Sequence, residues 1–365
     1  MGDTPVEPLY YPDYLQLDRL LSSQQLASAV EGNPVHDEML FIIVHQAYEL
    51  WFKQILWELD EVSRLLAPER VAETAMLRIV ARLERITEIQ KLLIQQIGVL
   101  ETMTPLDFLE FRNYLIPASG FQSVQFRLIE NRLGVRTEDR VKLAGNPYTT
   151  ALNMSDRLRV EEAESQPSIV DLIQAWLERT PFLDHGDFHF WDTYQASVLE
   201  MLEHDKGVVL TNPNLSEAER EAQLKSFDQT FALYEAVFDE TKHKALVAAG
   251  ERRLSHRAFQ AALFINLYRD APALQEPFRL LMLLMDIDQG FTTWRYRHAL
   301  MTHRMIGRRV GTGGSAGAAY LTRSADRTRV FIDLFQLSTF MIPRSLLPQL
   351  PHELERTMRF RFEEL

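Results

Sequence analysis

The sequence predicts an all-α protein, and two observations support that fold class. Apolar residues recur at the three- and four-residue steps of a helix in several long segments, and no segment shows the alternation typical of a strand. Internal repeats and low-complexity linkers are also missing from the sequence, so we expect residues 1–365 to form a single helical domain. Residues 1 to about 34 precede the first long helix and are expected to form an N-terminal arm.

Two long helices are expected in the first hundred residues. Residues 36–66 are apolar on nearly every face, which predicts a buried helix. Apolar residues then recur at helical steps between Met76 and Leu100, at Ile79, Leu83, Ile86, Ile89, Leu93 and Ile97. The segment "PASG", residues 117–120, breaks the next helical stretch, and Ser119 is expected to cap the helix that follows.

The second half of the chain repeats this helical pattern. Residues 137–168 are the most polar and least periodic part, which predicts a long loop or insertion. An aromatic stripe follows at Phe227, Phe231, Tyr234 and Phe238. Pro277 marks the expected start of a helix that runs to about Met305, and a last apolar stretch covers residues 330–342. Long apolar helices with many aromatic residues also suggest oligomer contacts.

Composition narrows the function classes. The chain has 365 residues and a net charge of −12, which argues against a general nucleic-acid binder. It contains no cysteine, which excludes disulfides, thiolate metal sites and a cysteine nucleophile. No charge-free apolar run approaches the ~18 residues of a membrane span, and the N-terminus does not resemble a signal peptide. We therefore expect a cytoplasmic protein with no membrane and no nucleic-acid partner.

Two polar residues interrupt apolar stripes in the first half of the chain. His45 lies on an aromatic face with Phe41 and Tyr48, where it is either a core histidine bonded to a backbone carbonyl or a ligand-binding group. Arg112 follows Phe108 by four residues, and its permanent charge requires an anion. A core glutamate and a substrate carboxylate are equally consistent with this position.

A third polar residue, the histidine His298, lies on an apolar stripe near residue 300. His298 follows Trp294 by four residues, whereas His303 lies about 140° further around the helix. The two histidines therefore cannot chelate one ion from this helix, and His298 is the buried candidate. A lone histidine is a poor zinc site, but it suffices for haem, because the porphyrin supplies four nitrogen ligands.

A glycine-rich segment, "GTGGSAG" at residues 311–317, follows this helix. It is neither a Walker A motif nor a dinucleotide fingerprint, because no Gly-Lys-Ser/Thr follows and no strand precedes it. It is either a surface loop or a loop that folds over a bound ligand, with Thr312 and backbone amides pointing inward.

Six long motifs in order resemble the tryptophan 2,3-dioxygenase family, over about residues 10–350. They are "HDEMLFIIVHQAYELWFKQILWELD", "FRNYLIPASGFQSVQFRLIEN", "GERRLSHRAFQAALFINLYR", "WRYRHALMTHRMIG", "GTGGSAG" and "DLFQLSTFMIPR". The resemblance implies an all-helical enzyme of the tryptophan/indoleamine 2,3-dioxygenase type with one haem b per subunit. It implies a homotetramer, a dimer of dimers, that opens the indole ring of L-tryptophan with O2 to give N-formyl-L-kynurenine.

The resemblance also implies roles for individual residues. His298 matches the axial haem ligand, with Trp294 packed beside it, and His45 matches the distal histidine near the indole N–H. Arg112 matches the residue that binds the substrate carboxylate. The remaining matches are Phe41 and Phe108 in the substrate pocket, Ser119 near haem and substrate, Thr312 at the substrate's amino-acid end, Gly313 beside the cofactor, and Tyr11, Tyr14 and Leu15 in an arm that reaches a neighbouring subunit's pocket.

Two departures from the family pattern leave a second activity open. Ala316 stands where the family loop has a second serine, and Ala318 and Ala319 precede the aromatic residue that usually follows the loop at once. Relatives with the same scaffold act as haem monooxygenases on tryptophan or its derivatives in biosynthesis. A haem sensor without turnover is the alternative from another class, although it would not need His45, Arg112 and Thr312 together.

Overall fold

The computed structural model describes residues 8–141, 146–185, 188–309, 311 and 318–359. Within these residues the fold is helical, as the sequence predicts. The one sheet in this part of the chain is a hairpin of β1 (Asp184–His185) and β2 (Phe188–His189), in which Asp184 pairs antiparallel with His189.

Helices α1 to α9 lie in the first half of the chain, up to residue 178. Their bounds are α1 Tyr11–Leu15, α2 Leu17–Leu21, α3 Ala27–Val30, α4 His36–Leu66, α5 Glu73–Leu100, α6 Pro105–Phe111, α7 Val124–Leu133, α8 Met154–Glu164 and α9 Ile169–Glu178. Short 3-10 helices connect them at η1 Arg112–Leu115, η2 Gly120–Gln122, η3 Thr137–Asp139 and η4 Tyr148–Ala151.

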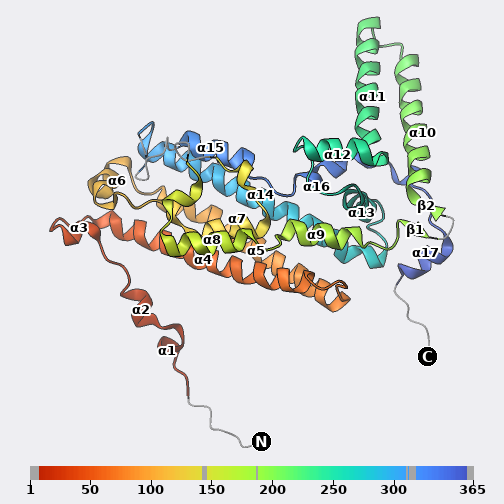
Figure 1. Cartoon of the computed structure of the whole chain (residues 1–365). Helices are drawn as coiled ribbons and strands as arrows, with labels where there is room; N and C mark the ends of the chain where they lie inside the picture. Colours follow the sequence, from red (N-terminus) through yellow and green to blue (C-terminus); the bar gives the residue numbers. More distant parts are fainter. Residues whose placement is uncertain (1–7, 142–145, 186–187, 310, 312–317, 360–365) are drawn as a thin grey trace, which may run out of the picture.

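The second half contains the longest helix and a projecting helical hairpin (Figure 1). Its elements are α10 Phe190–Thr211, α11 Glu217–Phe238, α12 Glu240–Ala248, α13 His256–Leu267, α14 Pro272–Ile306, α15 Ala318–Arg327, α16 Ile332–Gln336, η5 Leu337–Phe340, η6 Arg344–Leu346 and α17 His352–Thr357. The predicted aromatic stripe lies in α11, where Tyr234 is buried and Phe231 is exposed.

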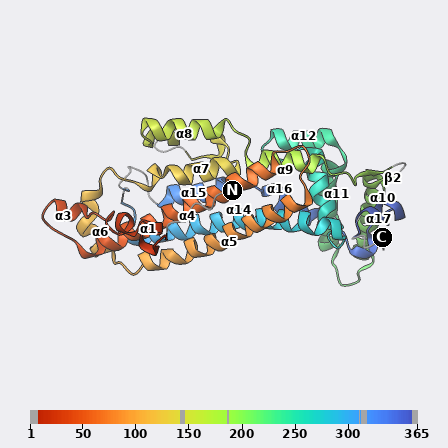
Figure 2. The ribbon, with the colours of Figure 1, turned by 90° about the horizontal axis from the view of Figure 1, so that it is seen from below.

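Three long helices, α4, α5 and α14, form the centre of the fold and run side by side in both views (Figures 1 and 2). The apolar stripe predicted on α5, which includes Ile79, Leu83 and Ile86, is buried where α5 packs on α4 and α14. α5 and α14 are in close contact at Gly290, where an added Cβ would sit 2.5 Å from Gln90 Oε1. Gln90 Nε2 donates to the carbonyl of Ile287 at this contact. This hydrogen bond fixes the position of α5 along α14.

The prediction that residues 36–66 form a helix is confirmed, but burial on nearly every face is wrong. One side of α4 leaves Met39, Ile43, Leu50 and Trp57 exposed, and Trp57 is 74% accessible. The other side packs on α5, α7 and α9, which leaves this apolar side uncovered by the described part of the chain. A helix that is apolar all round is therefore half buried here, and its outer side is available to another molecule.

Two predicted boundaries are also wrong. The helix that carries His298 begins at Pro272 rather than Pro277, because Pro272 takes the first helical position and Pro277 lies inside the helix. Residues 137–168 contain α8, which Asn153 caps by accepting from the backbone N–H of Asp156. Only Val160 and Ala163 of α8 are buried, so the segment carries little apolar periodicity in the sequence.

Ser119 acts as a cap, although for a shorter element than expected. Its hydroxyl accepts from the backbone N–H of Phe121 and caps η2, while Ser123 caps α7 in the same way. The last apolar stretch folds as α16 and η5, as expected for residues 330–342.

The N-terminal arm extends away from the helical body (Figure 1). Its helices α1 and α2 contain no buried residue, and Tyr11 and Tyr14 are about 70% exposed. None of the helices in the described part of the chain is long and apolar enough to cross a membrane.

Candidate functional site

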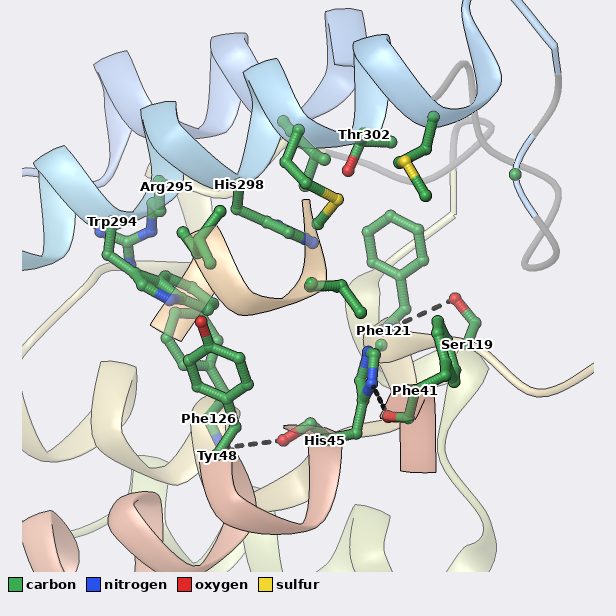
Figure 3. Close-up of a pocket in the computed structure, with 18 of the residues that line it drawn as sticks. Phe41, His45, Tyr48, Ser119, Phe121, Phe126, Trp294, Arg295, His298 and Thr302 are labelled. Atoms are coloured by element: carbon green, nitrogen blue, oxygen red, sulfur yellow. Dashed lines mark hydrogen bonds between the residues drawn. The ribbon is translucent and has the colours of Figure 1, made fainter. Parts of the chain in front are cut away.

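One cavity brings together most of the candidate residues (Figure 3). It lies between α4, α14 and the irregular segment that follows α6, and the first turns of α7 and α15 complete its wall. His298, Trp294, His45, Phe41, Phe108, Arg112 and Ser119 all border it. Residues that the sequence separates by more than 250 positions therefore share one site.

His298 faces the cavity from α14 (Figure 3). Burial, and secondarily the proximity of His45, lowers its pKa to about 4, so its imidazole is neutral at physiological pH. Its ring stacks on the Trp294 indole with centroids 5.5 Å apart and an interplanar angle of 13°. His303 is exposed and His298 is partly buried, so His298 is the more buried member of the pair, as predicted.

The hydrogen bonding of His298 indicates that it serves a ligand. Within the described part of the chain, its ring nitrogens have no hydrogen-bond partner, although the ring is desolvated. Buried polar groups are normally paired, so a desolvated neutral imidazole that faces a cavity is suited to donating its lone pair to a metal. No group of three or more His, Asp or Glu side chains in the described residues could hold an ion by itself. Haem needs only one such protein ligand, so this arrangement fits it.

His45 faces the same cavity from α4, and its tautomer follows from one contact. Its Nδ1 lies 2.7 Å from the carbonyl oxygen of Phe41, one turn earlier. A carbonyl oxygen can only accept, so Nδ1 carries the proton and donates it, and Nε2 is left as an acceptor. Desolvation by the surrounding protein lowers the pKa of His45, which keeps this neutral form dominant at pH 7. The carbonyl bond agrees with the first reading of His45, but the residue is exposed rather than part of the core, and Nε2 remains available as an acceptor.

Aromatic side chains form the apolar wall around His45. The Phe41 ring lies 4.0 Å from the His45 ring and 5.8 Å from Phe108, centroid to centroid. Phe111 packs edge-on against Phe108 at 5.4 Å. These rings offer flat apolar surface to a ligand with an aromatic ring of its own.

Arg112 and Ser119 enter the cavity from the segment after α6. Thr104 and Asp107 form a capping box that starts α6, and η1 continues it from Arg112. Ser119 is fixed by its own capping box with Gln122. The Arg112 guanidinium, a permanent cation, and the Ser119 hydroxyl therefore line the same cavity as Phe108.

A tyrosine supports the His298 side of the cavity. The Tyr48 hydroxyl donates to the carbonyl of Leu93 at 2.8 Å, and burial raises its pKa to about 12. Its ring meets the Trp294 indole edge-on at 5.9 Å. Tyr48 therefore holds in place the residue that stacks on His298.

Sequence reasoning missed four residues at the cavity. Arg127, Glu130, Arg295 and Tyr320 all border it, and all four are buried. Arg127 and Glu130 lie among the apolar residues of α7, so the interruption of that stripe was an available signal. Arg295 gave a weaker signal, because its partner Glu130 is distant in sequence.

Five candidate residues are not seen at the cavity in the described part of this chain. Thr312 and Gly313 lie outside the described residues, although Gly311 and Tyr320 on either side of them border the cavity. Tyr11, Tyr14 and Leu15 are exposed on the arm and do not border the cavity of their own chain.

Comparison with known proteins identifies the family. Residues 4–341 match the family model described as tryptophan 2,3-dioxygenase. A protein of that name from Bdellovibrio bacteriovorus is 49% identical over 97% of this chain and 99% of its own length. Tryptophan 2,3-dioxygenases from Anopheles gambiae (49%; 96% of this chain, 90% of theirs) and Xenopus laevis (48%; 94% and 84%) are similarly close. A match of this extent, together with the cavity, shows that the chain belongs to the tryptophan 2,3-dioxygenase family.

Proposed function

We propose that this protein is a haem-dependent tryptophan 2,3-dioxygenase that opens the indole ring of L-tryptophan with O2 to give N-formyl-L-kynurenine, the first step of tryptophan degradation by the kynurenine route. The observation that carries this proposal is a cavity with a neutral His298 on one wall, without a hydrogen-bond partner among the described residues, and a neutral acceptor, His45, on the other. The names of the relatives favour ring opening over the monooxygenase alternative.

We assign the cofactor site to α14. His298 would hold the iron of haem b, one per subunit, and Trp294 would stack beside it, with Ser119 and Gly313 near the macrocycle. When bound, haem would activate O2, which is otherwise unreactive towards indole. The stacking of Trp294 on His298, and of Tyr48 against Trp294, would fix the orientation of the ligating imidazole.

The opposite wall would bind the substrate. Arg112 would pair with the carboxylate of tryptophan through two charge-assisted hydrogen bonds, and Thr312 would contact the amino-acid end. Phe41 and Phe108 would pack on the indole, and Nε2 of His45 would accept the indole N–H. These contacts would hold the C2–C3 bond of indole in one position and exclude water. His45 need not remove a proton, because C3 of indole is already electron-rich.

We further propose a cytoplasmic homotetramer, a dimer of dimers, built from single-domain chains of residues 1–365. Tyr11, Tyr14 and Leu15 of the arm, about residues 1–34, would complete the cavity of a neighbouring subunit. The exposed arm and the uncovered apolar side of α4 support such an assembly, because both leave large apolar side chains in water in an isolated chain.

Isotope labelling tests the reaction. The haem-loaded ferrous protein is mixed with L-tryptophan under labelled O2, and the product is analysed by mass spectrometry. We expect N-formylkynurenine that carries two labelled atoms. A single labelled atom in a product with an intact indole would identify the monooxygenase instead, and no conversion by fully loaded protein would favour a sensor.

A further inference from the structure

A buried cluster of charges adjoins the cavity and has no role in the reaction described above. Glu130 accepts from three arginines: Arg140 Nη1 at 2.7 Å, Arg295 Nη2 at 2.9 Å and Arg127 Nη1 at 3.0 Å. All four residues are at least nine-tenths buried. We call these residues, Arg127, Glu130, Arg140 and Arg295, the Glu130 cluster.

The Glu130 cluster carries more positive than negative charge. Burial alone would raise the pKa of Glu130, but the three arginines outweigh it and hold that pKa at about 2. The cluster therefore has one carboxylate for three guanidinium groups, an excess of two positive charges. The nearby buried carboxylate of Asp288 offsets this excess only in part, because its interaction with Arg295 is weaker than that with its own cation, Arg329, at 3.7 Å.

The excess charge is directed towards the cavity. Arg127, Glu130 and Arg295 border it, whereas Arg140 does not and bonds Glu130 from behind, with Asn131 and the Tyr148 ring as further contacts. Nε of Arg127 has no hydrogen-bond partner among the described residues. A buried cation without a full set of partners is costly, so these arginines require anions from the cavity.

The chemistry that satisfies two cavity-facing guanidinium groups is a pair of carboxylates. Two sources exist at this site: the two propionate groups on one edge of haem b, and the single carboxylate of the substrate. Arg295 precedes His298 by three residues on α14, so the two side chains are neighbours on the helix surface. The number of charges and this proximity both favour the cofactor.

We infer that Arg127 and Arg295 neutralise the two haem propionates and that Glu130 is a positioning residue that keeps both arginines in place. This inference rests on the proposed function, since it assumes that His298 binds haem. It assigns the recognition of the porphyrin edge to α7 and α14 together, and it leaves Arg112 for the substrate.

Porphyrin esters test the assignment without any mutation. Protein freed of haem is titrated with haem b and with its dimethyl ester, and binding is followed by the Soret band. We expect esterification to weaken binding roughly 30-fold or more, because it leaves the buried arginines without anions. Equal binding of the two porphyrins would overturn the inference alone, whereas binding of neither would also overturn the proposed function.

Variants locate the effect. In Arg127→Met and Arg295→Met, which keep side-chain length, we expect haem b to bind more weakly. We also expect the ratio of the dissociation constants of the dimethyl ester and haem b to fall several-fold. Glu130 retains two arginine partners in each variant, and circular dichroism checks that it folds. Arg252→Met is the matched control: Arg252 is equally buried, lies 4.0 Å from the Phe259 ring and does not border the cavity, so its ratio should stay at the wild-type value.

The substrate remains the competing source of carboxylate. A Soret titration of the loaded variants with L-tryptophan and with tryptamine, which lacks the carboxylate, separates the two. If Arg127→Met loses the preference for tryptophan over tryptamine while keeping its preference for haem b over the ester, the arginines bind substrate and the inference is wrong.

Discussion

The two histidine-bearing walls of the cavity are built on opposite principles. On the α14 wall, His298 is partly buried without a hydrogen-bond partner in the described residues and is held only by aromatic stacking. On the α4 wall, His45 is fixed by a bond to the Phe41 carbonyl, which determines its tautomer. An imidazole left unpaired is suited to a metal, and one with a fixed tautomer is suited to a directional hydrogen bond. The two walls therefore differ in how much each histidine should matter.

The largest expected effect is at His298. His298→Ala removes the only protein ligand proposed for the iron, so the purified variant should lose its Soret band or retain only a small part of it. His303→Ala is the matched control, because His303 lies on the same helix and is exposed. Equal haem content in the two variants would refute the assignment of the ligand.

The next effect is at Arg112, on the wall opposite α14. Arg112→Met leaves the substrate carboxylate without its partner in an enclosed site, which should lower kcat/KM for L-tryptophan about 100- to 1,000-fold. Tryptamine, which has no carboxylate, should be a very poor substrate for both proteins and should lose little more in the variant. Steady-state kinetics on the two compounds provides the comparison, and a large further loss on tryptamine would indicate a structural role instead.

A smaller effect is expected at His45. Its Nε2 accepts one hydrogen bond from a neutral N–H, and such a bond contributes roughly 0.5–1.5 kcal/mol. His45→Ala should therefore retain about a tenth or more of the wild-type kcat/KM with full haem content. An inactive His45→Ala beside a nearly normal Arg112→Met would reverse the two roles and make His45 an essential base.

The smallest effect is in the pH dependence. Desolvation lowers the pKa of His45 below its ordinary value of 6.5, so the imidazole is mostly neutral at pH 7 and above. The kcat/KM of the wild type should be level between pH 7 and 8 and fall only in the acid range, as protonation removes the acceptor. His45→Gln keeps an acceptor that does not titrate, so its profile should lack this acidic limb. An identical limb in the variant would assign the titration to another group.

The sequence predicted those features that depend on neighbours along one helix. The length of α4, the apolar stripe of α5 and the burial of His298 relative to His303 all follow from helical spacing. α8 was missed because it buries only Val160 and Ala163 and is otherwise polar. Spacing alone favoured a single buried histidine, whereas the identity of the cofactor came from the family resemblance.

Contacts between distant segments could not be predicted in this way. Glu130 lies 165 residues from Arg295, and neither position alone indicates that a carboxylate on α7 would gather arginines from two other segments. The exposed side of α4 was missed for a similar reason. Apolar residues on all faces of a helix show that each side prefers to be covered, but not whether the cover belongs to the same chain.

In the proposed assembly, the exposed arm would make the completeness of each cavity depend on protein concentration. In the proposed assembly, Tyr11, Tyr14 and Leu15 serve a neighbour, so a chain that dissociates would keep its haem ligand and lose part of its substrate wall. Association follows mass action, and dilution would therefore weaken the apparent affinity for tryptophan before it removed the cofactor. In such a mixture, a subunit that cannot bind haem could still contribute its N-terminal arm to the substrate cavity of an active neighbouring subunit.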